Sequence, residues 1–150
     1  LAIPSFATAP ALIIVGLYML SNVISINGGV QLDLMGQENA ESTGTRQLSG
    51  VGGQMDFLEG AYRSKGGKGF ICINSSRVTK DGERKSNILA TIPGGSTISA
   101  PRTMIQYVAT EYGIASLSGK TLRERAEAMA SIAHPDFREE LMKYAQENFK

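Results

Sequence analysis

Residues 49–57 read SGVGGQMDF, a stretch whose composition suits the binding of negative charge. Gly50, Gly52 and Gly53 carry no side chains, so a ligand can approach the main-chain NH groups closely. The following letters, MDFLEGAYRS, predict a short helix, which would add the positive end of its dipole at this point. Such a loop could bind a phosphate, a carboxylate or the oxyanion of an acyl-transfer intermediate. A strand-to-helix turn without a ligand explains the same glycines equally well.

A second group of polar residues lies where strands and loops meet. Glu111 and Tyr112 belong to TEYG, between an apolar run and a glycine turn. Lys68 lies in one basic stretch and Ser75 precedes another, SRVTKDGERK. Basic loops can contact phosphates, although charged loops are usually just solvated. Glu111 has the same two interpretations, a carboxylate facing a cleft or one that is solvated or paired with a basic residue.

Several other motifs do not support the chemistry they suggest. GIASLSGKT, residues 113–121, has one residue too many between its glycines for a phosphate-binding P-loop, so we predict no nucleotide hydrolysis. One histidine and one cysteine are too few for the usual zinc or iron–sulfur site, so we predict no metal. We interpret His134 as a joint between two helices and Cys72 as a buried strand thiol.

The elements that must position these residues follow from periodicity and turn signals. A chain of 150 residues is long enough for one domain with a core, and its net charge of +1 gives no reason to expect nucleic acid. Alternation on either side of residues 27–29 (Asn-Gly-Gly) predicts a β-hairpin, and GFICI and NILATI predict strands. Thr121 and Glu124 predict a capping box, and Pro135 suits the start of a last helix. The pattern predicts an α/β fold with two helices at the C-terminus.

The first 20 residues contain no charged side chain, and a membrane span needs about 20 apolar residues. Pro4 and Pro10 interrupt the first half, so the continuous apolar run, Ala11 to Leu20, has only the length of a core helix or strand. No basic residue flanks this run, as a signal peptide would require. We therefore interpret the segment as the apolar end of a domain from a longer protein, and we predict no membrane partner.

Four stretches together resemble one known family. SGVGGQMDFLEGA, SKGGKGF and TEYGIASLSGKTLRERAEAMASIAHPDFREEL are similar to the C-terminal domain of the acetyl-CoA hydrolase/transferase family, and SINGGVQLDLMGQENAES matches as well. The resemblance runs from about Val23 to about Leu141 and is strongest to 4-hydroxybutyrate and butyrate:acetate CoA-transferases. It implies an open, mostly parallel sheet flanked by helices, with residues 1–150 as the C-terminal domain of a longer enzyme.

The resemblance also implies a chemistry, the exchange of CoA between a short-chain acyl-CoA and a carboxylate such as acetate. In this family a glutamate carboxylate attacks the thioester, and the reaction proceeds through an anhydride and a glutamyl-CoA thioester. That glutamate lies upstream of this chain, in the protein's own N-terminal domain, so the fragment alone is expected to be inactive. Gly52 and Gly53 would bind the oxyanion. The residues implied to contact substrate or CoA are Gly50, Gln54, Lys68, Ser75, Glu111 and Tyr112.

The same resemblance implies no cofactor, because CoA is a substrate, and it implies a cytoplasmic homo-oligomer. Transfer and hydrolysis differ only in whether a carboxylate or water resolves the glutamyl thioester, and the sequence leaves both open. A non-catalytic CoA-binding or assembly module of the same fold is the alternative. It is motivated by residues 1–20 and by INSSRVTKDGERKSNI, which depart from the family pattern.

Overall fold

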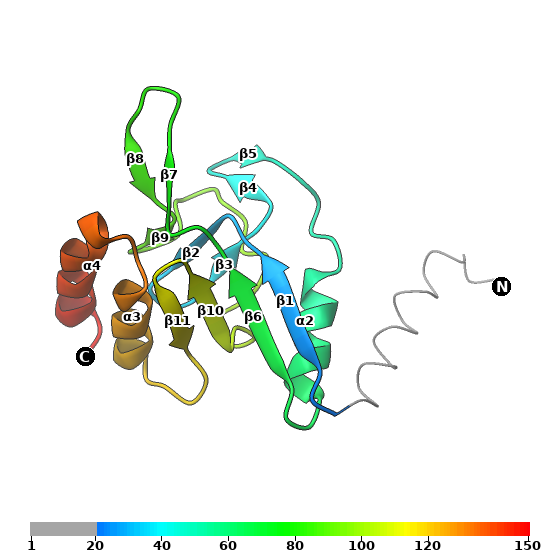
Figure 1. Cartoon of the computed structure of the whole chain (residues 1–150). Helices are drawn as coiled ribbons and strands as arrows, with labels where there is room; N and C mark the ends of the chain where they lie inside the picture. The colour runs from blue at the N-terminus through cyan, green and yellow to red at the C-terminus, as the bar shows by residue number, and fades with distance from the viewer. Residues whose placement is uncertain (1–20) are drawn as a thin grey trace.

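The structure is a computed structural model that describes residues 21–150, so the predictions for residues 1–20 lie outside the described residues. Its centre is a four-stranded sheet with the order β1-β6-β10-β11 (Figure 1). The first three strands are parallel to one another and the fourth is antiparallel to β10. The predicted open, mostly parallel sheet is confirmed. The strand bounds are β1 Ile24–Gly28, β6 Lys68–Cys72, β10 Tyr107–Thr110 and β11 Gly113–Ser116.

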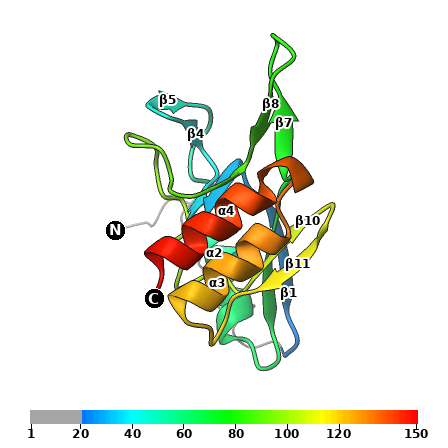
Figure 2. The same cartoon turned by 90° about the vertical axis from the view of Figure 1, so that its left-hand side faces the viewer.

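The helices within residues 21–150 lie on one side of this sheet (Figures 1 and 2). They are α2 (Gln54–Arg63), α3 (Leu122–Ser131) and α4 (Pro135–Asn148). The start of α3 has the predicted capping box, because the Glu124 amide donates to Thr121 Oγ1 and the Thr121 amide donates to Glu124 Oε2. Pro135 occupies the first turn of α4, as predicted, and His134 caps it by accepting a hydrogen bond from the Asp136 amide. The interpretation of His134 as a joint between helices is confirmed.

Shorter strands form three smaller sheets around the central one, within residues 21–150. One has the order β3-β2-β9, and two are the hairpins β4–β5 and β7–β8. The charged stretch 76–86, interpreted from the sequence as a charged surface loop, forms the β7–β8 hairpin that projects from the body (Figure 1). The bounds are β2 Gln31–Asp33, β3 Glu38–Asn39, β4 Ser42–Thr43, β5 Arg46–Gln47, β7 Ser76–Val78, β8 Arg84–Ser86 and β9 Ile88–Leu89.

The hairpin predicted around residues 27–29 is wrong. β1 pairs in parallel with β6, whereas β2 leaves for a different sheet and pairs with β3 and β9. Gly29 serves another purpose, since a Cβ there would lie 2.5 Å from Glu38 Oε1. The close approach of a buried side chain, rather than a tight reversal of the chain, requires glycine at this position.

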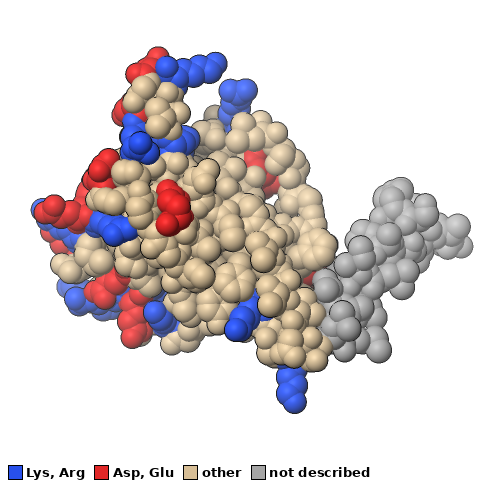
Figure 3. All heavy atoms as spheres, viewed as in Figure 1, with Lys and Arg blue, Asp and Glu red and all other residues tan. Residues whose placement is uncertain are grey.

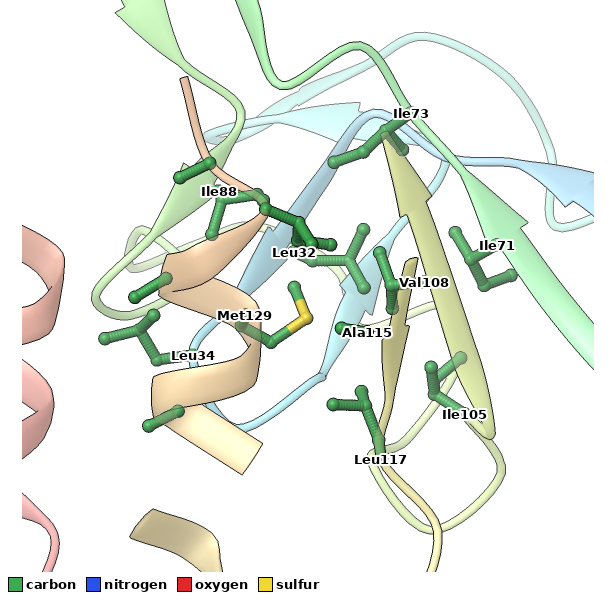
Figure 4. Packing of buried hydrophobic residues seen from close by; sticks show 14 of the residues in the cluster. Leu32, Leu34, Ile71, Ile73, Ile88, Ile105, Val108, Ala115, Leu117 and Met129 are labelled. Atoms are coloured by element: carbon green, nitrogen blue, oxygen red, sulfur yellow. The ribbon is translucent and has the colours of Figure 1, made fainter. Parts of the chain in front are cut away.

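The core fills the space between the central sheet, the small β3-β2-β9 sheet and the helices. Figure 4 shows Met129 extending from α3 toward strands that carry Leu32, Val108 and Ala115. Leu32, Val108 and Met129 are fully buried, and burying side chains of this size contributes about 1.5–3 kcal/mol each. Core side chains come from strands at both ends of the sequence. The glycine loop and the carboxyl ends of the strands are therefore attached to the same packed core.

A buried guanidinium ties the loops beneath the core together. Arg125 donates hydrogen bonds from Nε to the Met35 carbonyl at 2.9 Å, from Nη1 to the Leu117 carbonyl at 2.7 Å and from Nη2 to the Arg102 carbonyl at 2.8 Å. Burial, followed by repulsion from Arg102, lowers the pKa of Arg125 from its usual value. One side chain thus satisfies carbonyl groups from three separate loops.

In the described part of the chain, no helix is both long and apolar enough to span a membrane.

Candidate functional site

The glycine loop that precedes α2 lies on the surface. Gly50, Gly52 and Gly53 are exposed, and Gly53 is the N-cap of α2 without any side-chain cap. Gly52 has a φ of +60°, and a Cβ built there would meet no atom within 4 Å. Its backbone conformation therefore requires glycine, while the space beside it stays open. Within residues 21–150, the amides of Gly52 and Gly53 donate no hydrogen bond, so both are available to a ligand at the start of a helix.

Beneath this loop lies a buried carboxyl group that sequence reasoning missed. Glu38 is fully buried, and Gln54 Nε2 donates to its Oε1 at 2.7 Å and to its Oε2 at 2.6 Å. Desolvation by burial raises the pKa of Glu38 to about 7, against the smaller lowering by the Gln54 hydrogen bond. Gln54 is the first residue of α2, so the carboxyl group is tied directly to the end of the glycine loop.

Nothing in the sequence signals that Glu38 is buried. It lies in the polar stretch MGQENAES, which predicts a loop or a short helix. The structure fixes it through β3, where its amide donates to the Ala100 carbonyl and its carbonyl accepts from the Ser99 amide. Only the long-range pairing of residues 38 and 99–100 reveals the position, and such pairings leave no local pattern.

A cleft of about 400 Å³ opens at the carboxyl ends of the parallel strands. This is the place where open α/β sheets bind ligands, because the loops diverge there. The lining residues, none of them charged, are Gly29, Cys72, Ile73, Asn74, Ala109 and Thr110. Gly29 belongs both to the cleft and to the contact with Glu38, so the buried carboxyl group lies next to the cleft wall.

The structure contradicts the prediction of a buried thiol at Cys72. The side chain is exposed, at the last position of β6 beside the cleft. The apolar run GFICI predicts a strand covered on both sides, and the strand is confirmed. Its burial alternates, however, because in residues 21–150 one face of the sheet carries no covering element.

Ser75 and Glu111 form a second group next to the cleft. The Ser75 amide donates to Glu111 Oε2 at 2.9 Å, and the Ser75 hydroxyl donates to Glu111 Oε1 at 2.5 Å. Desolvation acts to raise the pKa of Glu111, but the two hydrogen bonds from Ser75 outweigh it and lower the pKa below its usual value. These residues directly follow the cleft residues Asn74 and Thr110, so an ionised carboxylate stands at the rim.

The other predicted contact residues lie farther from the cleft. Tyr112 packs edge to face against His134, with ring centroids 5.6 Å apart, and the Arg138 guanidinium lies 5.0 Å from its ring centroid. Lys68 begins β6, so it lies about 13 Å along the strand from Cys72 at the cleft. The structure thus groups Gln54 with the glycine loop and Ser75 with Glu111. It leaves Lys68 at the opposite end of the sheet.

This region combines the glycine loop with a separate cleft, since no residue of 50–54 lines the cleft. It offers free main-chain amides at a helix start, an uncharged cleft and two carboxyl groups in opposite states, one raised and one lowered in pKa. Among the described residues, no group of three or more His, Cys, Asp or Glu side chains could hold a metal ion.

Comparison with known proteins assigns the chain to a family. Residues 14–145 match the acetyl-CoA hydrolase/transferase C-terminal domain. The chain belongs to this family. It is 49% identical over 127 residues to the butyryl-CoA:acetate CoA-transferase of Anaerostipes caccae and 50% identical over 128 residues to the 4-hydroxybutyrate coenzyme A transferase of Clostridium kluyveri. The predicted family resemblance is confirmed.

The chain spans under a third of the length of these relatives. The two alignments cover 85% of this chain but only 28% and 29% of the respective relatives. An acetyl-CoA hydrolase of Kluyveromyces lactis is 32% identical over 124 residues, which are 81% of this chain and 22% of the hydrolase. The family therefore includes enzymes named for transfer and for hydrolysis.

Solved structures support the fold assignment. RipA from Yersinia pestis superposes with a TM-score of 0.73 at 41% identity, over 85% of this chain and 28% of RipA. The 4-hydroxybutyrate CoA-transferase from Porphyromonas gingivalis gives a TM-score of 0.63 at 40% identity, over 84% of this chain and 27% of that enzyme. The α/β fold of a CoA-transferase C-terminal domain is thus confirmed.

Proposed function

We propose that residues 1–150 form the C-terminal domain of an acyl-CoA:carboxylate CoA-transferase. The enzyme would exchange CoA between a short-chain acyl-CoA and a carboxylate such as acetate. The names of the relatives from Anaerostipes caccae and Clostridium kluyveri support this substrate class. The observation that carries the role of this domain is the pair of amides at Gly52 and Gly53, which are exposed and donate no hydrogen bond within the described residues.

In the proposed reaction, a glutamate carboxylate from the N-terminal part of the protein attacks the thioester carbonyl. CoA thiolate leaves, and a mixed acyl-glutamyl anhydride forms. The thiolate then attacks the glutamyl carbonyl of the anhydride, which releases the first carboxylate and leaves a glutamyl-CoA thioester. The acceptor carboxylate repeats these two steps in reverse order and departs as the new acyl-CoA.

Each of these attacks passes through a tetrahedral oxyanion, and we assign its stabilisation to the glycine loop. Main-chain NH groups at Gly52 and Gly53 would donate to the oxyanion, and the dipole of α2 would favour its charge. Gln54 would hold the loop in place through its hydrogen bonds to Glu38. Ser75 and Glu111 would shape the rim of the cleft. As part of this proposal we expect a cytoplasmic homo-oligomer that uses CoA as a substrate and needs no other cofactor.

A chimeric enzyme tests this function. Residues 14–145 would replace the matched segment of the Anaerostipes caccae enzyme, and CoA transfer from butyryl-CoA to acetate would be measured. Gly53→Ala fits the fold, because its Cβ would meet only the Phe57 ring at 3.6 Å, yet its methyl group would stand beside the amide. We expect kcat to fall about 100-fold or more. Gly94→Ala, whose Cβ would also meet no close neighbour, is the matched control.

Trapping separates the enzyme from the alternative module. Incubation of the unmodified chimera with acetyl-CoA and then borohydride should reduce one glutamate and abolish activity, because the glutamyl thioester is reducible. A chimera that folds, binds CoA and yet neither transfers nor traps would support a non-catalytic CoA-binding or assembly module. Full activity in the Gly53→Ala chimera would refute the role of the loop.

A further inference from the structure

The two faces of the central sheet differ sharply in their surroundings. Side chains alternate along each strand, so one set points to the core and the other points away. The core-facing set is buried and consists of Ser25, Gly69, Ile71, Val108 and Ala115. We call the opposite set the open face. It is formed by Ile24, Ile26, Gly28, Lys68, Phe70, Cys72, Tyr107, Ala109, Ile114 and Ser116.

Apart from Lys68 and Ser116, the open face is apolar, and it is continuous across all four strands. The strand register places Ile26 beside Phe70 and Phe70 beside Tyr107, and the last two rings stack with centroids 4.9 Å apart. Ile26 is 69% exposed, and Ile114 on the far strand is 64% exposed. Figure 3 shows this side of the molecule as a broad uncharged surface, with most of its charged groups near the margin.

The described residues cover only one face of this sheet. Parallel sheets occur almost only with both faces covered, because their strands carry apolar residues on both sides. Here α2 and α3 cover one face, with α4 packed on α3, and within residues 21–150 no helix lies on the other (Figure 2). Contiguous exposed apolar surface of this kind marks an interaction site.

We propose that the open face is the surface on which the remainder of the longer CoA-transferase chain packs. The proposal rests on the proposed function, which requires that remainder to bring the nucleophilic glutamate. The related enzymes are more than three times as long as the segment they share with this chain. Cys72 belongs to both the open face and the cleft, so a body packed on the open face reaches the site where its glutamate is needed.

Cys72 is also the reporter for the test, because it is the only cysteine of the chain and is exposed. Its alkylation by iodoacetamide would be followed by peptide mass spectrometry in the 150-residue chain and in two chimeras. The chimeras carry residues 14–145 in the Anaerostipes caccae and the Clostridium kluyveri enzymes. We expect alkylation of Cys72 to be about 10-fold or more slower in both chimeras than in the chain alone.

Ile26→Asp and its matched control, Val78→Asp, locate the protection. Both replace an exposed β-branched strand residue, 69% and 57% exposed, and Val78 lies on the projecting β7–β8 hairpin. In the 150-residue chain the two variants should lower Tm by similar small amounts. In the chimeras only Ile26→Asp should lower Tm further and restore fast alkylation of Cys72, because only it would bury a charge.

Two results would overturn the proposal. One is fast alkylation of Cys72 in both chimeras, with Ile26→Asp behaving like Val78→Asp. The other is concentration-dependent protection of Cys72 in the 150-residue chain that Ile26→Asp abolishes, which would make the open face a contact between two copies. CoA transfer is measured separately. If Cys72 is protected in the chimeras but they do not transfer CoA, the result would support the docking surface and contradict the proposed function.

Discussion

Replacement of Glu38 by Gln should stabilise the chain at alkaline pH and remove a pH dependence. Among the described residues, the fully buried carboxyl group has only the Gln54 amide as side-chain partner, and its pKa rises from 4.5 to about 7. At about 1.4 kcal/mol for each pKa unit, ionising Glu38 in the folded state costs about 3 kcal/mol more than in the unfolded state. Glutamine has nearly the same shape, stays neutral and can exchange two hydrogen bonds with Gln54.

The direction of the pH dependence follows from proton binding. Between pH 4.5 and 7 the folded chain retains a proton on Glu38 that the unfolded chain releases. This contribution to stability is fully present below pH 4.5 and is lost as the pH rises through 7. From pH 5 to pH 8.5 the wild-type chain should therefore lose about 2.5 kcal/mol relative to Glu38→Gln.

Urea unfolding followed by circular dichroism measures this difference at several pH values between 5 and 9. Circular dichroism suits the chain because it contains no tryptophan. Glu140→Gln, which removes an exposed carboxylate on α4, controls for the change in net charge. Stability curves of the wild type and Glu38→Gln that stay parallel over this range would refute the assignment of a buried carboxyl group with a raised pKa.

Three further substitutions test contacts that hold the site. Gly29→Ala places a Cβ 2.5 Å from Glu38 Oε1, so it should cost about 1–3 kcal/mol in urea unfolding, and Glu38→Ala in the same chain should recover most of that loss. Arg125→Met leaves three backbone carbonyls without their donor and should lower the free energy of unfolding by about 3 kcal/mol or more; a smaller loss would mean that water replaces the guanidinium. Thr121→Ala removes the cap of α3 and should cost about 1 kcal/mol, with no loss expected if Glu124 alone caps the helix.

Local signals in the sequence predicted the helices and part of the sheet. The capping box at Thr121 and the proline at the start of α4 act within a few residues, so their geometry can be read from spacing alone. The Asn-Gly-Gly sequence led to a wrong hairpin prediction, because glycine occurs both where the chain reverses and where another group approaches the backbone closely. What decides between them is Glu38, nine residues away from Gly29 in sequence and brought beside it by the fold.

The candidate site was predictable only in part, for a related reason. The glycine loop and its following helix are contiguous in sequence, and the structure leaves the loop exposed at the start of α2 as the composition suggests. The pair of Ser75 and Glu111 joins residues 36 positions apart, and the link between Glu38 and Gln54 joins residues 16 positions apart. No rule of sequence spacing predicts such pairs. The family resemblance indicated Ser75 and Glu111 as site residues but did not indicate Glu38.

The wrong prediction for Cys72 is itself informative about the complete protein. The letters of β6 and β10 read KGFIC and YVAT, in which both sets of alternating side chains contain apolar residues, whereas β1, ISING, carries its isoleucines only on the open face. A strand with one face in water normally alternates between apolar and polar residues. Ile24, Ile26 and Phe70 stand where such a strand would carry polar side chains, so these residues suit a sheet covered on both faces. Since α2 and α3 cover the core face and α4 packs on α3, a cover for the open face would come from outside residues 21–150. The chimera experiment tests whether the remainder of the enzyme supplies it.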